Sequence, residues 1–222
     1  MSVTEDRKKR IVVFISGGGS NMLSLAKAAA APDFPAEIIA VIADKADAGG
    51  LEKAAALGIS TFSFVRKDFP SKEAHEAAIL AELDRLRPDF LCLAGYMRLL
   101  SAVFIQRYEG RILNIHPSLL PLFPGLHTHQ RAIDAGMKIA GCTVHFVTEG
   151  MDDGPIVAQA AVPIIPGDTP ETLAARVLTV EHRTYPLALQ LVAEGKVRME
   201  AGRAISEAVG EASSTLISPA AR

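Results

Sequence analysis

Residues 11–31, IVVFISGGGSNMLSLAKAAAA, combine a strand, a glycine turn and a helix in one short segment. Residues 11–15 are continuously apolar, which favours a strand buried on both faces in the middle of a parallel sheet. The turn SGGGSN follows at 16–21, and an alanine-rich helix is expected over 22–31, ending beside Pro32. This unit predicts the beginning of a doubly wound α/β fold.

The same alternation continues as far as residue 115. We expect further strands at 38–43, 59–65, 90–94 and 111–115, with helices at 47–57, 71–86 and 101–108. Asp47 is the expected cap of the first of these helices. Alternating strands and helices predict a mostly parallel sheet with right-handed connections.

The pattern changes in the C-terminal half. A short helix is expected at 130–135, strands at 139–148 and 155–162, a long helix from Thr169 to Glu194, and a last short strand at 197–199. Only residues 149–154 join the two longer strands, whereas a parallel crossover needs about a dozen residues or more. The sequence therefore predicts an antiparallel hairpin.

The chain has 222 residues, of which 49% are hydrophobic, enough for a substantial core. We expect a single domain over 11–200 and flexible tails at 1–10 and 203–222, because residues after Gly202 are small and polar without periodicity. These boundaries are predictions from composition alone.

Charge and cysteine content restrict the class of protein. A net charge of −2 argues against a general nucleic-acid or membrane-surface binder. Cys92 and Cys142 lie in apolar strand-like runs, which favours buried free thiols in a reducing compartment. No apolar run reaches membrane-spanning length, and the charged start has no signal-peptide core. We therefore expect a cytoplasmic protein with no nucleic-acid or membrane partner.

The glycine turn at 16–21 is the first candidate binding element. A glycine turn that opens a helix presents free N–H groups to an anion. The turn does not fit the dinucleotide-binding pattern G-x-G-x-x-G, because Met22 stands at the last position. It does not fit the phosphate loop of nucleotide-binding proteins either, because no G-K-[ST] follows. A single phosphate is the favoured ligand, and a tight turn that needs positive φ is the alternative.

Residues 94–100, AGYMRLL, follow the fourth expected strand of the sheet. Ligands of open α/β sheets bind outside the carboxyl ends of the strands. Met97, Leu99 and Leu100 can therefore line an apolar slot for a flat ring, with backbone groups reading its edge. Ordinary packing at the start of a helix explains these residues equally well.

Residues 113–129, LNIHPSLLPLFPGLHTH, begin as a strand and become an apolar, proline-stiffened loop. Asn114 and His116 are two positions apart, so both point to one face of the strand and can donate hydrogen bonds to a developing oxyanion. A capping asparagine and a buried histidine are the alternative, which an isolated Asn-x-His would favour. His127 and His129 have no neighbouring carboxylate or cysteine, so we expect no metal.

Two further acidic positions have an ordinary interpretation. Asp152 lies in the turn MDDGP, where acidic residues beside glycine are common. A carboxylate brought to His116 by the hairpin would instead hold the imidazole and favour its charged form. Glu181 and His182, in the middle of the last helix, are on sequence alone an exposed or capping polar pair.

Five segments in this order carry a family resemblance: ISGGGSN, LAGYMRLL, NIHPSLLPLFPGLHTHQRA, VHFVTEGMDDGPIVAQ and VEHRTYP. Together they resemble the phosphoribosylglycinamide formyltransferase family of purine synthesis over roughly residues 11–200. The resemblance implies a formyltransferase-type fold with a Rossmann-like N-terminal half. It also implies transfer of a formyl group from the co-substrate 10-formyltetrahydrofolate to the amine of glycinamide ribonucleotide, without a metal.

The resemblance also implies the site residues. Asn114, His116 and Asp152 match the family's catalytic trio. Gly19, Ser20 and Asn21 match its phosphate loop. Glu181 matches a carboxylate that binds the ribose, which differs from the exposed or capping role that its position alone favours. The folate-binding positions, which also include Asn114, are Met97, Arg98, Leu99, Leu100 and Lys72.

Two positions depart from the family. Gly18 stands where the family often carries asparagine, which leaves the loop's N–H groups in place. Lys72 stands where many relatives carry an arginine near the folate's glutamate tail, and lysine keeps the charge but loses the bidentate fork.

The trio implies a direct mechanism. The substrate amine attacks the formyl carbon, Asn114 donates to the resulting oxyanion, and His116 stabilises it and protonates the leaving nitrogen. Asp152 accepts the amine proton through a water. Neither a metal nor a covalent enzyme intermediate is required.

Three alternatives share parts of this pattern. A methionyl-tRNA formyltransferase would need a further basic C-terminal domain. A formyltetrahydrofolate deformylase would carry an N-terminal regulatory domain and would lack PGLHTH. A non-catalytic phosphate-binding module has no need for Asn114, His116 and Asp152 together. The sequence leaves open whether the chain is a monomer or a homodimer.

Overall fold

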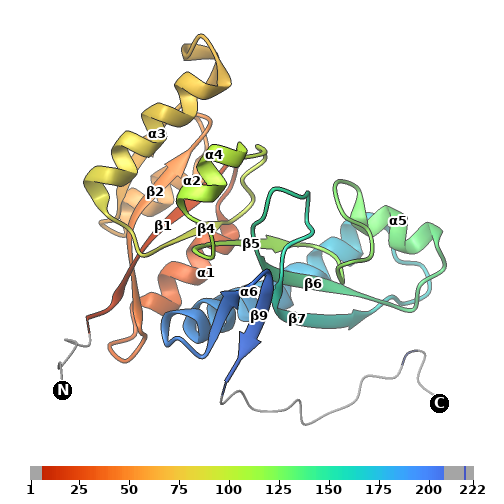
Figure 1. Ribbon diagram of the computed structural model, residues 1–222. Helices are drawn as coiled ribbons and strands as arrows, with labels where there is room; N and C mark the ends of the chain where they lie inside the picture. Colours follow the sequence, from red (N-terminus) through yellow and green to blue (C-terminus); the bar gives the residue numbers. More distant parts are fainter. Residues whose placement is uncertain (1–6, 208–217, 219–222) are drawn as a thin grey trace.

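A computed structural model describes residues 7–207 and residue 218. Its centre is a seven-stranded sheet in the order β3-β2-β1-β4-β5-β6-β7, and β8 and β9 form a separate pair (Figure 1). The strands are β1 Lys9–Ile15, β2 Ala36–Ala43, β3 Ser60–Ser63, β4 Phe90–Leu93, β5 Ile112–His116, β6 Ile139–Phe146, β7 Ile156–Pro163, β8 Val197–Glu200 and β9 Arg203–Ser206. The helices are α1 Ser20–Ala29, α2 Gly49–Ala56, α3 Lys72–Leu86, α4 Ala102–Arg107, α5 Thr128–Asp134 and α6 Pro170–Ala193, with a 3-10 turn at Arg66–Asp68.

The sheet confirms the predicted fold class. Strands β1 to β5 pair in parallel, whereas β6 pairs antiparallel with both β5 and β7. The chain leaves β1 towards β2 on one side and returns through β4 on the other. The carboxyl ends of β1 and β4 therefore border the crevice in which ligands of doubly wound sheets bind.

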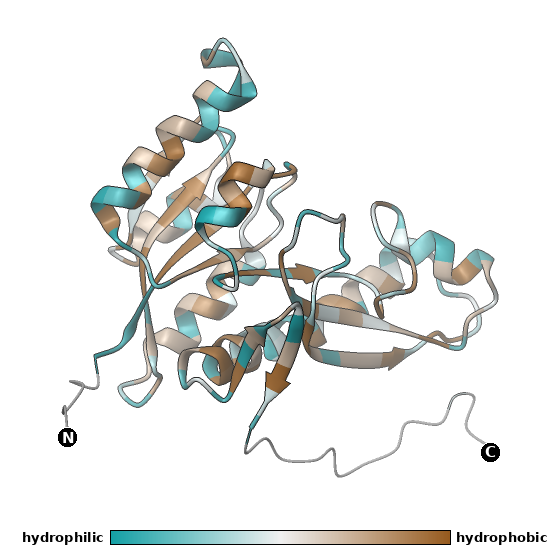
Figure 2. Cartoon of the chain, in the orientation of Figure 1, coloured by the Kyte–Doolittle hydropathy of each residue, from teal (hydrophilic) through white to brown (hydrophobic). Residues whose placement is uncertain are grey.

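Two apolar layers cover the sheet, and Figure 2 shows the apolar strands between them. Strand β1 supplies both layers because its side chains alternate, as its uniformly apolar sequence predicts. Ile11, Val13 and Ile15 pack with residues of α1 and α6, whereas Val12 and Phe14 pack with residues of α3 and α4. Residues 11–15 of this central strand, with helices on both faces, are completely buried.

Helix α6 connects the two halves of the sheet. Its first turns pack Leu173 and Val177 on the antiparallel strands, and its later turns pack Leu189 on the parallel ones. The buried Tyr185 hydroxyl lies 3.1 Å from the carbonyl oxygens of both Leu93 and Leu113, which ties α6 to β4 and β5. One helix therefore holds the parallel and antiparallel parts in a fixed relation.

The structure differs from the sequence prediction at several element boundaries, among them the start of β1, which includes Lys9 and Arg10 of the expected N-terminal tail. Helix α2 has Ala48 rather than Asp47 as its N-cap, and the N–H of Gly50 is bound instead by the carbonyl of Gly17. Strand β9 lies inside the segment 203–222, for which we expected a flexible tail. Its partly buried Ala204 packs on the core beside Met199 of β8, which explains why this part of the segment is ordered. Residues 1–6, 208–217 and 219–222 of the expected tails lie outside the described residues.

Cys92 and Cys142 are both free and buried, as expected, and burial raises their thiol pKa values to about 12 and about 11. Within the described part of the chain, no helix combines the length and apolar character needed to cross a membrane.

Candidate active site

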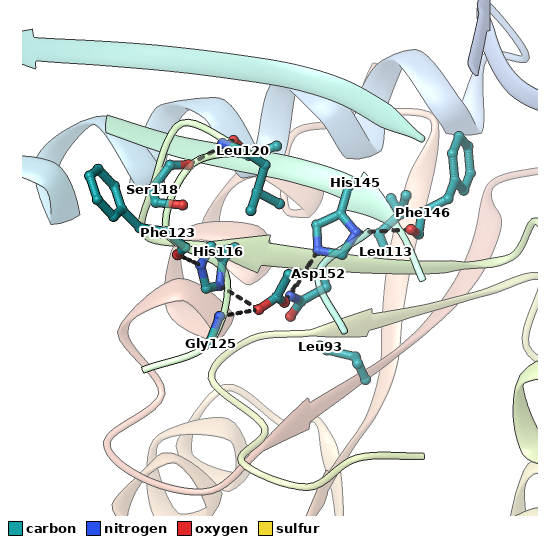
Figure 3. Close-up of polar contacts among 12 residues, drawn as sticks. Leu93, Leu113, His116, Ser118, Leu120, Phe123, Gly125, His145, Phe146 and Asp152 are labelled. Carbon is teal, nitrogen blue, oxygen red and sulfur yellow. Dashed lines mark hydrogen bonds and ion pairs between the residues drawn. The ribbon is translucent and has the colours of Figure 1, made fainter. Parts of the chain in front are cut away.

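The centre of the candidate site lies at the carboxyl end of β5 (Figure 3). Asn114 and His116 occupy alternate positions of this strand, which places both side chains on one face. The antiparallel pairing with β6 sets Asn114 opposite His145 and His116 opposite Thr143. Two strands thus converge on one small polar cluster.

Asp152 comes to this cluster from the connection between β6 and β7. Its backbone has a positive φ of 52°, and its Oδ2 accepts a hydrogen bond of 2.8 Å from the N–H of Gly125. The same oxygen lies 3.4 Å from Nδ1 of His116 (Figure 3). The structure therefore brings the three predicted catalytic residues together.

His116 also contacts the proline-rich loop. Its Nε2 lies 3.0 Å from the carbonyl oxygen of Phe123. A carbonyl only accepts hydrogen bonds, so Nε2 carries a proton in this contact. Both ring nitrogens of His116 are therefore engaged, one by Asp152 and one by Phe123.

His145 belongs to the cluster, although the sequence did not single it out. Its Nδ1 lies 2.9 Å from the carbonyl of Phe146, so Nδ1 donates and Nε2 is free to accept. The amide nitrogen of Asn114 lies 3.1 Å from that Nε2 and donates to it. Burial lowers the pKa of His145, which favours the neutral ring. His145 thus orients the Asn114 amide, whose second hydrogen is left for a ligand.

A hydrogen-bond network fixes the loop that carries Phe123. Thr143 Oγ1 donates to the carbonyl of Ser118 at 2.7 Å and accepts from the N–H of Leu120 at 3.0 Å. Gln159 Nε2 donates to the carbonyl of Leu120 at 2.9 Å. The apolar loop predicted from sequence is therefore packed on the antiparallel strands, through polar residues that we did not predict.

The two histidines at the end of this loop show no metal-like arrangement. His127 is the N-cap of α5, and burial, followed by the charge of His116, lowers the pKa of His129. Across the described residues, no group of three or more His, Cys, Asp or Glu side chains is placed to hold a metal ion.

The glycine turn adopts a braced conformation before α1. Gly19 has a φ of 71°, and a Cβ there would lie only 2.8 Å from the Cα of Gly50, so this position requires glycine. The N–H of Gly50 and the ammonium of Lys53 donate to the carbonyls of Gly17 and Gly18 at 3.0 Å and 2.8 Å. The first N–H groups of α1 have no partner within the helix, so this end suits an anion.

Asn21 and Glu181 meet beside this turn. The Asn21 amide nitrogen donates to Glu181 Oε2 at 2.7 Å. Burial raises the pKa of Glu181, and the hydrogen bond from Asn21 opposes this shift. Only 7% of Glu181 is exposed, so the sequence interpretation of an exposed or capping residue is wrong.

The segment 94–101 lies between β4 and α4. Ser16 anchors its beginning, because Ser16 Oγ accepts from the N–H of Met97 at 2.8 Å. Asp44 anchors its middle by accepting from Arg98 Nε at 2.8 Å. Met97 and Leu99 are 65% and 64% exposed, so their side chains are accessible to an apolar ligand.

Lys72 is the first residue of α3 and lies at the far end of this segment. Its ammonium lies 3.8 Å from Glu76, a buried carboxylate that also accepts from the N–H of Ser101 at 2.9 Å. Lys72 is thus connected to the end of segment 94–101 through Glu76. Its side chain remains partly exposed and can still meet an anionic group.

The formyl transferase family matches residues 9–189, which make up most of the chain. The chain belongs to the formyl transferase family. This confirms the resemblance that the five sequence segments indicated.

Two relatives are similar to this chain over most of its length. The phosphoribosylglycinamide formyltransferase of Escherichia coli (strain K12) is 46% identical over 189 residues, which cover 85% of this chain and 89% of that protein. The trifunctional purine biosynthetic protein adenosine-3 of Drosophila pseudoobscura pseudoobscura is 49% identical over 193 residues. The chain spans only 14% of that much longer protein.

Solved structures share the fold. The crystal structure of phosphoribosylglycinamide formyltransferase from Brucella melitensis has a TM-score of 0.83 and 71% identity, covering 88% of this chain and all of that one. A formyltetrahydrofolate deformylase from Pseudomonas syringae has the same TM-score at 26% identity, covering 90% of this chain and 66% of its own. The fold alone therefore does not separate transfer from hydrolysis, whereas the sequence identity is far higher to the transferases.

Proposed function

We propose that this protein transfers the formyl group of 10-formyltetrahydrofolate to the amine of N1-(5-phosphoribosyl)glycinamide, a step of purine biosynthesis. The observation that carries the proposal is the contact of Asp152 with His116 beside Asn114, in a chain that is 46% identical to the Escherichia coli enzyme over 89% of its length. A binding module would have no use for such a cluster.

The ribonucleotide binds at the start of α1 and along α6. Its phosphate lies against the N–H groups of Gly19, Ser20 and Asn21, where the helix dipole favours an anion. Its ribose hydroxyls donate to Glu181. The open space at Gly17 and Gly18, where an added Cβ would meet no atom within 4 Å, supports close approach of the phosphate.

The folate binds along the segment 94–101. Met97, Leu99 and Leu100 form the apolar wall, and backbone groups of the segment form hydrogen bonds with the polar edge of the ring. Arg98, held at Nε by Asp44, keeps its other guanidinium nitrogens for the folate, and Lys72 meets the anionic glutamate tail.

The chemistry takes place where the two substrates meet. The amine attacks the formyl carbon, and the new oxyanion accepts a hydrogen bond from the Asn114 hydrogen that His145 does not use. The attacking amine loses its proton to Asp152 through a water, and the folate nitrogen receives one from His116 as its bond to the formyl carbon breaks. Holding both substrates together supplies much of the rate by proximity.

The loop contact of His116 sets a condition on this mechanism. Nε2 donates to the Phe123 carbonyl in this structure, so that contact must be exchanged for the substrate before His116 can donate to the folate. Gly125, whose N–H holds Asp152, lies on the same loop. Substrate binding therefore has to separate Nε2 of His116 from the Phe123 carbonyl while Gly125 keeps its contact with Asp152.

The proposal requires only these two small molecules as partners. It includes neither nucleic acid nor a membrane, and it is compatible with a monomer or a homodimer. The free thiols of Cys92 and Cys142 support a reaction in the reducing cytoplasm.

One assay tests the proposal. Purified protein is mixed with 10-formyltetrahydrofolate and glycinamide ribonucleotide, and both the folate product and the formylated ribonucleotide are quantified. We expect equal amounts of the two products, and little folate product when the ribonucleotide is omitted. Folate product formed at the same rate without the ribonucleotide would identify a deformylase instead, and no product at all would reject both activities. An Asn114→Ala variant is the matched control for chemistry in the folded protein.

A further inference from the structure

Asn21 is the second residue of α1 and has two separate connections. Its N–H belongs to the open first turn of the helix, whereas its side chain reaches Glu181 of α6, which is 160 residues away in sequence. Asn21 and Glu181 are only 8% and 7% exposed, and their contact of 2.7 Å is short. The contact therefore lies inside the molecule, between two helices that meet at the candidate ribonucleotide site.

We propose that Asn21 is a positioning residue that couples the phosphate loop to Glu181, so that the phosphate and ribose ends of the ribonucleotide are held as one unit. This inference rests on the proposed function and deepens it by separating two roles of Asn21. The backbone N–H faces the phosphate, and the side chain sets the carboxylate that receives the ribose hydroxyls.

The hydrogen bond from Asn21 occupies one acceptor site of Glu181 and leaves Oε1 fully available to a ligand. Oε2 accepts from Asn21, so Oε1 remains as the acceptor for a hydroxyl. The Oδ1 atom of Asn21 is buried and has no partner among the described residues. The donation to Glu181 is accordingly the interaction that orients the Asn21 amide.

The charge state of Glu181 depends on its surroundings. Burial raises its pKa, and the amide of Asn21 is the largest opposing influence. The other titratable groups that interact with it are His182 on α6, His116 at the end of β5 and Cys142 on β6. The ionised carboxylate only accepts at its two oxygens, so the Asn21 hydrogen bond favours the form that can accept from Asn21 and from the ribose hydroxyls together.

A purely structural role is the competing explanation. Helices α1 and α6 already pack through apolar side chains, among them Met22, Leu25 and Leu189. If Asn21 only held these helices together, its loss would affect both substrates alike. The two explanations therefore differ in which substrate is affected and at which pH.

The test compares Asn21→Ala with Ser24→Ala. The first variant keeps the backbone N–H but removes the donor to Glu181, and the second removes a hydrogen bond of 2.8 Å from Ser24 to the Asn21 carbonyl on the same turn. We expect Asn21→Ala to raise the KM for the ribonucleotide about 10- to 100-fold, as for a lost hydrogen bond to a charged group. The KM for the folate and the competitive inhibition constant of inorganic phosphate should stay unchanged, and Ser24→Ala should match the wild type.

The dependence of kcat/KM on pH distinguishes the two explanations, because a loss of packing alone would not change it. Removing the Asn21 donor raises the pKa of Glu181 further, so the acid limb of kcat/KM for the ribonucleotide should shift to higher pH. In a Glu181→Gln background, Asn21→Ala should leave this limb in place. Equal changes in both KM values, or an unmoved limb, would overturn the coupling.

Should Asn21→Ala fail to fold, Asn21→Ser provides the same measurements with a smaller loss of packing. If the wild type shows no formyl transfer, the proposed function has failed. If the wild type transfers formyl groups and the variants behave like it, only the coupling has failed.

Discussion

The parallel and antiparallel halves of the sheet contribute different kinds of group to the candidate site. In the parallel half, β1 and β4 end in segments that offer mainly backbone groups, a helix N-terminus and apolar walls. On the antiparallel side, β5, β6 and the turn after β6 bring together His116, His145 and Asp152. We therefore propose that one half binds the substrates and the other carries the chemistry.

The difference follows from how the strands are connected. Parallel strands end at one edge of the sheet, so their following loops meet there and form a binding crevice. Antiparallel strands place residues directly opposite one another, so Asn114 faces His145 and His116 faces Thr143. Substitutions in the two halves should therefore affect different kinetic constants.

Removing the oxyanion donor should have the largest effect. We expect Asn114→Ala to lower kcat about 10²–10³-fold, as for other lost oxyanion-hole donors, with smaller changes in both KM values. Steady-state kinetics with each substrate varied in turn measures this, and thermal unfolding checks that the variant is folded. Near-normal turnover would remove Asn114 from the chemistry.

Glu181→Gln should affect binding of the ribonucleotide instead. We expect its KM to rise about 10- to 100-fold, the value of a hydrogen bond to a charged group, with kcat at saturation much less affected. Isothermal titration with the ribonucleotide provides an independent check. A fall in kcat with an unchanged KM would contradict the assignment of Glu181 to ribonucleotide binding.

The same variant has a consequence for stability. Because folding raises the pKa of Glu181, the wild type loses stability as pH rises from the unfolded-state pKa through the folded one. Glutamine does not ionise, so the Glu181→Gln variant has no such loss. Its stability relative to the wild type should therefore increase as pH rises between these two pKa values. Denaturant unfolding at pH 4 and pH 8 compares the two proteins.

Arg98→Lys should have the smallest effect. The charge opposite Asp44 is retained, but the planar fork is lost, and partly exposed ion pairs contribute little. We expect the KM for the folate to rise about two- to fivefold, which corresponds to less than about 1 kcal/mol. If only the KM for the ribonucleotide changed, the assignment of Arg98 to the folate would be wrong.

The parallel half could be predicted from sequence because its signals are local. The apolar run at 11–15, the glycine turn and the helix that follows are neighbours in the chain, and the structure places them as expected. The family resemblance extended this prediction to residues whose position alone was ambiguous, such as Glu181.

His145 and Thr143 could not be found in the same way. Their importance arises from the register between β5 and β6, which sets them opposite Asn114 and His116. No spacing within one segment reveals that register. The bonds from Asn21 to Glu181 and from Arg98 to Asp44 likewise join residues far apart in sequence, and they became visible only in the folded chain.

The most direct test of this division of labour is the single-turnover rate of formyl transfer in Asp152→Asn, with both substrates saturating. Asparagine can keep the contact with the Gly125 N–H but cannot accept the amine proton. We predict that the rate falls about 10²-fold or more, the usual contribution of a general acid–base residue, while both substrates bind as in the wild type. An unchanged transfer rate at saturation, with only the substrate affinities weakened, would contradict the assignment of chemistry to the antiparallel half.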